Sequence, residues 1–145
     1  MSEPPVAHTG PIGLYLALRA VDAGIRHAES LGIAVSLAVV DSGGVLKAFA
    51  RMDGAEVAGE VLAVDKAFTA LALRSSTAEL APLAEAGGEL FGLHAAGRGR
   101  YVLIGGGLPV SSAAVVVGAV GVSGGSVEQD VRCAEAMLAA LLAGF

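Results

Sequence analysis

The sequence predicts an α/β domain of the α+β type, an antiparallel β-sheet with helices packed on it. Three observations indicate this class. Apolar residues recur at helical spacing near both ends of the chain. Two segments of alternating pattern, 34–40 and 45–51, flank a glycine turn. The segment 101–127 is apolar, uncharged and punctuated by glycines. The predicted order is α-β-β-α-α-β-β-β-α, in a single domain of residues 1–145 whose residues 1–10 form a mobile tail.

The first half of the chain predicts a helix followed by a β-hairpin. Pro11 is a favourable first helical residue, and Gly32 follows the end of the helix. The helix carries an apolar stripe of Leu14, Leu18, Val21 and Ile25. In the strand 34–40, alternate residues face opposite sides of the sheet, with Val35, Leu37 and Val39 on one side. The segment Asp41-Ser42-Gly43-Gly44 is typical of a turn, after which 45–51 returns as the second strand.

Two further helices are predicted in the middle of the chain. Asp53 can cap the first of them, with Glu56 reaching back as in a capping box. Its predicted apolar stripe contains Val57, Val61, Val64, Phe68 and Leu71. The segment 76–79 (Ser-Thr-Ala-Glu) is a second capping box that opens a short helix, and the glycine-rich segment 86–100 is predicted to be a loop or a broken helix.

The last third predicts three strands and a helix. The strands are placed at 101–104, 108–111 and 115–122, and a third capping box at 126–129 opens the final helix. The 27 uncharged residues from 101 to 127 are long enough for a membrane helix. Their many glycines, serines and a proline favour buried strands and tight turns instead, so we expect no membrane span.

Composition limits the class of partner. The net charge of −5 argues against a nucleic-acid partner. With 54% hydrophobic and 16% charged residues, the chain is expected to cover apolar surface by forming a homo-oligomer.

The single cysteine, Cys133, excludes an intramolecular disulfide. No basic residue precedes the first apolar stretch, as a secretory signal would require, and we expect a cytoplasmic protein.

Five segments, in order, carry a resemblance to a known family. The chain resembles the small haem-binding proteins that include the GlcG proteins and HbpS, and it is similar to the carboxy-terminal domain of PduO-type corrinoid adenosyltransferases. The resemblance covers about Leu14 to Leu142. The five segments are Ala38-Val39-Val40-Asp41 with Gly43-Gly44, Arg51-Met52-Asp53-Gly54-Ala55, Lys66-Ala67 with Thr69-Ala70, Gly106-Gly107-Leu108-Pro109, and Val117 to Gly125.

The resemblance implies a profilin-like fold with a five-stranded antiparallel sheet, ring-like or stacked oligomers, and haem or corrinoid binding in some members. The chain departs from the family pattern in three places, one of which is Val131, where an acidic residue is common after Gln129-Asp130. Ala113-Ala114 stands where a glycine is expected, and Glu56, Glu60 and Asp65 place acid beside the presumed pocket. These three carboxylates are compatible with a metal ion, another cation or a different small molecule as the ligand.

The first functional hypothesis is an oligomeric protein that binds haem or a related tetrapyrrole. His27 and His94 are the candidate axial ligands of the iron. Arg51 or Arg98 would bind the propionates, and Thr69 is a further candidate ligand-binding residue on the long helix. For His27, the dipole at the end of the first helix is an alternative explanation, and His94 is also explained as a solvated loop residue.

The second hypothesis is a cofactor-independent enzyme of the isomerase, hydratase, lyase or cyclase type that acts on a small metabolite. Lys66 lies on a largely apolar helix face, where desolvation can lower the pKa of an amine. Together with Asp41, Asp53 or Glu60 it would supply the acid and the base. Structural explanations compete: Asp41 as a turn residue, Asp53 as a helix cap and Lys66 as a lysine paired with a carboxylate.

Overall fold

The computed structural model describes residues 12–145. The predicted helix start at Pro11 and the predicted tail 1–10 lie outside these residues. The chain forms, in order, α1 (Leu14–Ser30), β1 (Ser36–Asp41), β2 (Leu46–Arg51), α2 (Gly59–Leu73), α3 (Thr77–Leu80), the 3-10 turns η1 (Pro82–Ala84), η2 (Leu93–Ala95) and η3 (Gly97–Gly99), β3 (Gly107–Ser112), β4 (Val115–Ser123) and α4 (Val127–Ala143).

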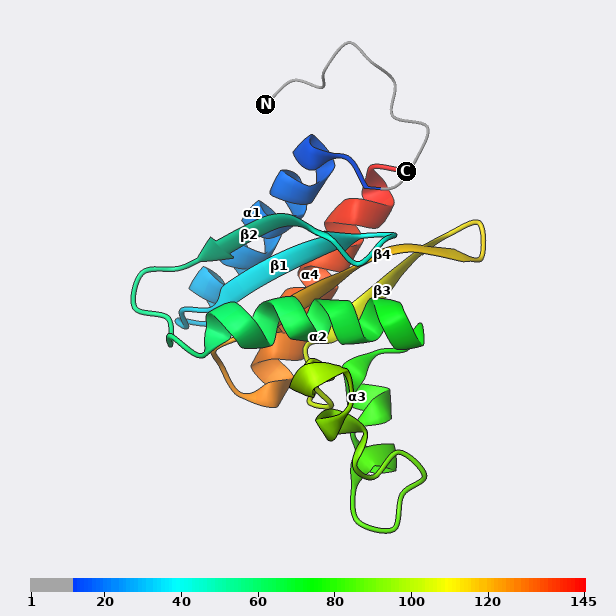
Figure 1. The fold of residues 1–145 in the computed structure, drawn as a ribbon. Coiled ribbons are helices and arrows are strands. Elements are labelled where there is room, and N and C mark those ends of the chain that lie inside the picture. Colours follow the sequence, from blue (N-terminus) through cyan, green and yellow to red (C-terminus); the bar gives the residue numbers. More distant parts are fainter. Residues whose placement is uncertain (1–11) are drawn as a thin grey trace.

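The sheet is antiparallel throughout, with strand order β2-β1-β4-β3. Helices α1 and α4 pack on one face, and α2 crosses the other (Figure 1). The predicted alternation in the first strand is confirmed: Val35, Leu37 and Val39 belong to the core under α1 and α4, whereas Ala38 and Val40 belong to the core under α2. A strand with apolar residues on both sides is buried on both faces, which is how β1 comes to lie inside the sheet.

The prediction of a fifth strand was wrong, because the described residues form a four-stranded sheet and 101–104 is not a strand. The backbone N–H of Val102 donates to the side-chain oxygen Oγ1 of Thr69 at 2.9 Å, so a helix side chain takes the place of a neighbouring strand. Gly106, at φ +129°, then turns the chain into β3. The segment 101–104 therefore packs beside α2 and does not add a strand to the sheet.

The second helix begins later than predicted. Its first residue is Gly59, and no side chain caps it, so Asp53 and Glu56 do not form the expected capping box. The turn before it is closed by the Arg51 side chain, which donates to the carbonyl oxygen of Ala55 from Nε at 3.1 Å and from Nη2 at 2.7 Å. The predicted capping box at 126–129 is confirmed in both of its hydrogen bonds, and in the box at 76–79 the Ser76 side chain accepts from the Glu79 N–H.

The buried face of α2 also differs from the predicted stripe. Val57, just before the helix, is 78% exposed and Val61 is 62% exposed, while the helix turns small residues toward the sheet. The reason is a close approach at Gly121 of β4, where an added Cβ would lie 2.1 Å from the carbonyl oxygen of Ala63 and 2.7 Å from the backbone nitrogen of Ala67. Helix backbone can lie this near a strand only where both sides are small.

None of the helices in residues 12–145 combines the length and the apolar character that crossing a membrane requires.

Candidate ligand-binding cleft

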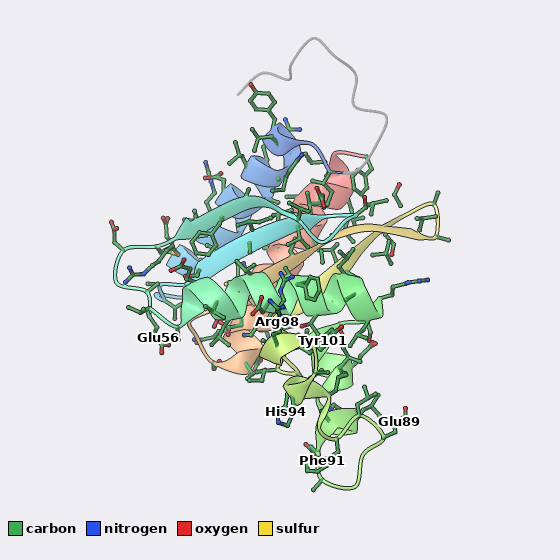
Figure 2. All side chains as sticks on the ribbon, in the orientation of Figure 1. Glu56, Glu89, Phe91, His94, Arg98 and Tyr101 are labelled. Carbon is green, nitrogen blue, oxygen red and sulfur yellow. The ribbon has the colours of Figure 1, made fainter. Side chains whose placement is uncertain are left out.

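A cleft of about 530 Å³ opens beside the first half of α2. Its walls come from α2, from the α3–η1 region and from the segment 101–104, and they are mostly apolar, including Leu62, Leu103 and Ile104. Three polar residues line it, Glu85, His94 and Tyr101. Figure 2 shows His94 on the segment that projects from the body of the molecule, with Phe91 nearer the tip and Glu89 on the opposite side of that segment. A mostly apolar hollow with a few polar groups is the usual form of a small-molecule site.

Hydrogen bonds from α2 and α3 hold the inner wall of the cleft. The Thr69 hydroxyl donates to the carbonyl oxygen of Asp65 at 2.7 Å, which aims its oxygen at the N–H of Val102. At the other end of this segment, the N–H of Gly107 donates to the Thr77 side chain at 2.9 Å. Thr69 and Thr77 are both fully buried. Their hydroxyls therefore satisfy backbone groups that would otherwise be buried without a partner, and Thr69, a predicted ligand-binding residue, supports the wall from behind.

Arg100 fixes the point where the projecting segment returns to α2. Its Nε donates to a carboxylate oxygen of Asp65 at 3.2 Å, and its guanidinium carbon lies 3.6 Å from the centroid of the Phe68 ring. The neighbouring Tyr101 ring also contacts Phe68, with centroids 6.1 Å apart. Arg98, two residues before Arg100, is exposed and adopts a left-handed backbone conformation at φ +62°. Of these two arginines, Arg98 is the one whose charge remains in solvent.

Lys66 does not lie with Asp41, Asp53 or Glu60 as the enzyme hypothesis expected. It is 2% exposed, and its Nζ lies 3.1 Å from a carboxylate oxygen of Asp130 on α4 and 3.0 Å from the carbonyl oxygen of Val122. The other carboxylate oxygen of Asp130 accepts from the N–H of Gly125 at 2.8 Å. This buried pair ties α2 to the start of α4 around the end of β4.

Burial is the largest influence on the pKa of Asp130 and on that of the neighbouring Cys133. Removal from water raises the pKa of Asp130 above its usual 3.8, against the opposing effects of the Gly125 N–H and of Lys66. Burial, with a smaller contribution from the negative charge of Asp130, raises the pKa of the Cys133 thiol to about 11. The thiol is therefore protonated at neutral pH, and it is buried in the core.

The other carboxylates predicted as site residues, Asp41, Asp53 and Glu60, do not line the cleft. Oδ1 of Asp41 accepts from the N–H of Gly43 at 2.9 Å and from the N–H of Val45 at 3.1 Å, which is the turn role that its position indicates. Asp53 and Glu60 are exposed, and neither lines the cleft. Arg51 is engaged with the carbonyl oxygen of Ala55.

The two candidate iron ligands lie on opposite faces of the sheet. His27 is on α1, whereas His94 lines the cleft on the side of α2. One chain therefore cannot place both imidazoles on the same iron. Nε2 of His27 is buried and has no hydrogen-bond partner among residues 12–145. Within the same residues, no cluster of three or more His, Cys, Asp or Glu side chains is arranged to hold a metal ion.

Sequence reasoning missed Glu85 and Tyr101 as cleft residues and Asp130 as the partner of Lys66. A signal existed for Asp130: it lies in the first turn of a helix, four residues before Ala134 and three before Cys133, and so on the apolar side of that helix. An acid on a buried helix face requires a buried partner.

The comparisons with known proteins agree on one family. A family model described as "Haem degrading protein HbpS-like" matches residues 12–139. The chain is 43% identical over 111 residues to a 15.0 kDa protein from the dhaT–dhaS intergenic region of Citrobacter freundii, covering 77% of this chain and 78% of that protein. It is 37% identical over 119 residues to the corrinoid adenosyltransferase PduO of the same organism, covering 82% of this chain but only 36% of PduO. The chain thus spans about a third of the length of PduO.

Solved structures show the same fold. The protein ORFY of Klebsiella pneumoniae superposes with a TM-score of 0.90 at 35% sequence identity, covering 99% of each chain. A structure described as a PduOC:heme complex superposes with a TM-score of 0.87 at 32% identity, covering 90% of this chain and 94% of the other.

Proposed function

The chain belongs to the HbpS-like family, and from this premise we propose that it binds haem or a related tetrapyrrole in the cleft at His94. The observation that carries the proposal is the imidazole of His94 on the wall of a mostly apolar cleft. A haem needs apolar surface for its two faces and a nitrogen, sulfur or phenolate donor for its iron. Leu62, Leu103 and Ile104 supply the first, and His94 supplies the second.

The donor set of the cleft fits the group. A neutral imidazole is a common proximal ligand of haem iron, and Tyr101 adds a second donor on the same wall. The propionates need a cation, and Arg98 is exposed on the same segment as His94. Glu85, also in the cleft, disfavours an approach of the propionates on its own side. Bound iron would supply ligand exchange or redox chemistry, while this chain supplies the apolar walls and the axial nitrogen.

We further propose that a second copy of the chain covers the cleft. The cleft is open to solvent, and large apolar residues are exposed around and near it, among them Phe91 at 65% and Ile104 at 47%. Exposed apolar surface of this kind is costly in water and marks a contact site. Lys66 does not support the enzyme hypothesis, because it is 2% exposed and is already paired with Asp130.

A haem titration tests the proposal. The purified protein should shift the Soret band of haem saturably, with a stoichiometry of about one haem per chain or one per chain pair. His94→Ala should abolish or displace the band, whereas His27→Ala is the matched control, since it removes an imidazole from the opposite face of the sheet. The proposal is refuted if haem gives no saturable shift, or if His27→Ala changes the spectrum while His94→Ala leaves it intact.

A further inference from the structure

A second cleft, of about 580 Å³, lies at the opposite end of α2. Three elements converge on it: the β1–β2 turn at residues 42–44, the last two turns of α2, and the start of β4. It shares no residue with the cleft at His94. Gly44 lets the turn close onto the helix, because an added Cβ at Gly44 would lie 3.3 Å from the side chains of both Phe68 and Leu71.

The backbone around this cleft is strained at two residues that line it. Arg74 ends α2 in the left-handed conformation, at φ +51°, and Ala114 forms the β3–β4 turn at φ +64°, beside Ala113 at φ +49°. Glycine or asparagine adopts this conformation at the least cost and is the usual residue at such a helix end. Strain of this kind gathers at functional sites. An arginine at a position where glycine would be more stable is best explained by a use for its side chain.

The residues that line the cleft indicate what the Arg74 side chain could bind. Arg74 is exposed, and its guanidinium makes no ion pair or hydrogen bond with any residue from 12 to 145. The carbonyl ends of α2 contribute a partial negative charge of about half a unit, which the full positive charge of Arg74 outweighs. Beside it, Leu71 and the β4 residues Val115 and Val116 line the cleft with apolar side chains, as does Phe68, whose ring is covered on one face by Arg100. Asp41, the nearby acid of the β1–β2 turn, is occupied by the N–H groups of Gly43 and Val45.

We propose that this second cleft binds a small organic acid with an apolar body. The carboxylate pairs with the guanidinium of Arg74, the Ser42 hydroxyl is available to the same group, and the apolar body lies against Phe68, Leu71 and Val115. A planar guanidinium recognises a carboxylate through two parallel N–H bonds. This site is separate from the proposed haem cleft, and its occupation does not depend on His94.

Ligand-observed NMR with 4-phenylbutyrate tests the inference, and the neutral alcohol 4-phenylbutan-1-ol separates the charge from the apolar body. The acid should bind saturably in the millimolar range or tighter, and the alcohol about tenfold more weakly, as expected when one charge-assisted hydrogen-bonded pair is lost at an exposed site. Arg74→Gln should weaken binding of the acid by a similar factor. Arg132→Gln removes an exposed arginine from α4, on the other face of the sheet, and should change nothing.

Ala72→Glu provides an independent variant, because Ala72 lines the cleft, is exposed on α2 and tolerates a good helix former. The added negative charge should abolish binding of the acid while circular dichroism and haem binding stay as in the parent protein. The inference is overturned if the acid does not bind saturably, if acid and alcohol bind equally, or if Arg74→Gln and Ala72→Glu bind the acid as the parent does. Loss of haem binding in His94→Ala with retained binding of the acid would keep the two sites distinct.

Discussion

Replacing Lys66 by methionine should be one of the most damaging single changes in this protein. The substitution keeps the length of the side chain but leaves the carboxylate of Asp130 at 4% side-chain exposure without its cation. The carbonyl oxygen of Val122 loses the same donor. The N–H of Gly125 remains as a partner for Asp130, but a single neutral donor does not replace a whole charge.

The geometry sets the size of the effect. Two unit charges 3.1 Å apart attract by about 5 kcal/mol at an effective dielectric constant of about 20. The cost of removing both charges from water offsets much of this attraction in the intact pair, so the pair itself adds little net stability. Removing one partner leaves that cost without compensation, and we expect Lys66→Met to lower the free energy of unfolding by about 3–5 kcal/mol at pH 7.

A double-mutant cycle in urea is the assay. Lys66→Met, Asp130→Asn and the double variant are compared with the parent protein at constant pH and salt. Asp130→Asn keeps an acceptor for the N–H of Gly125 while it removes the charge. The double variant should therefore recover much of the loss seen in Lys66→Met, with a coupling free energy of at least about 2 kcal/mol.

The pH dependence follows from the pKa of Asp130, which burial raises above 3.8 in the folded protein. A raised folded-state pKa means that this group's contribution to stability is complete below pH 3.8 and is lost as the pH rises through the folded-state value. Without Lys66 that value rises further, so the difference in stability between Lys66→Met and the parent should shrink as the pH falls. Three results would refute the reasoning. They are additive effects of Lys66→Met and Asp130→Asn on the free energy of unfolding, a cost of Lys66→Met below about 1 kcal/mol, and a stability difference between Lys66→Met and the parent that grows as the pH falls.

Three further outcomes follow from the packing. Thr69→Val leaves the N–H of Val102 without its acceptor, which should cost about 1–3 kcal/mol in urea denaturation and speed hydrogen exchange at Val102; an unchanged exchange rate would contradict this. Gly121→Ala places a methyl group against the backbone of α2 and should cost at least about 1–3 kcal/mol in thermal or urea unfolding, whereas a neutral result would mean that α2 can move away from the sheet. Cys133, with a thiol pKa of about 11 and full burial, should not react with a thiol reagent at pH 8 until urea unfolds the chain; rapid reaction of the native protein would count against the buried position.

Much of the fold was predictable from local patterns. The alternation at 34–40 and 45–51 separates the two faces of the sheet, and the turn at 41–44 joins its two strands, because strand geometry sends neighbouring side chains to opposite sides. The capping box at 126–129 predicts the start of α4 within one residue, since its two hydrogen bonds form within four consecutive residues. The segment 101–104 has the composition of a strand and still forms none, because the Thr69 side chain, 33 residues away, accepts the hydrogen bond of Val102.

The candidate site was less accessible to sequence reasoning. His94 could be named as a candidate ligand, but the cleft that it lines is assembled from α2, α3–η1 and 101–104, which only the folded chain brings together. Lys66 was recognised as unusual on its helix, yet its partner Asp130 lies 64 residues away.

By itself, the sequence determined where most helices and strands begin, which faces of the strands are apolar, and to which family the chain belongs, since all three depend on neighbouring residues or on ordered segments. Only the tertiary structure decided that four strands form the sheet and that α2 packs on the sheet through its small residues. It also decided that His27 and His94 lie on opposite faces of the sheet and that Lys66 forms an ion pair with Asp130. These outcomes depend on contacts between residues far apart in the chain, where close packing and the pairing of buried polar groups override local preference.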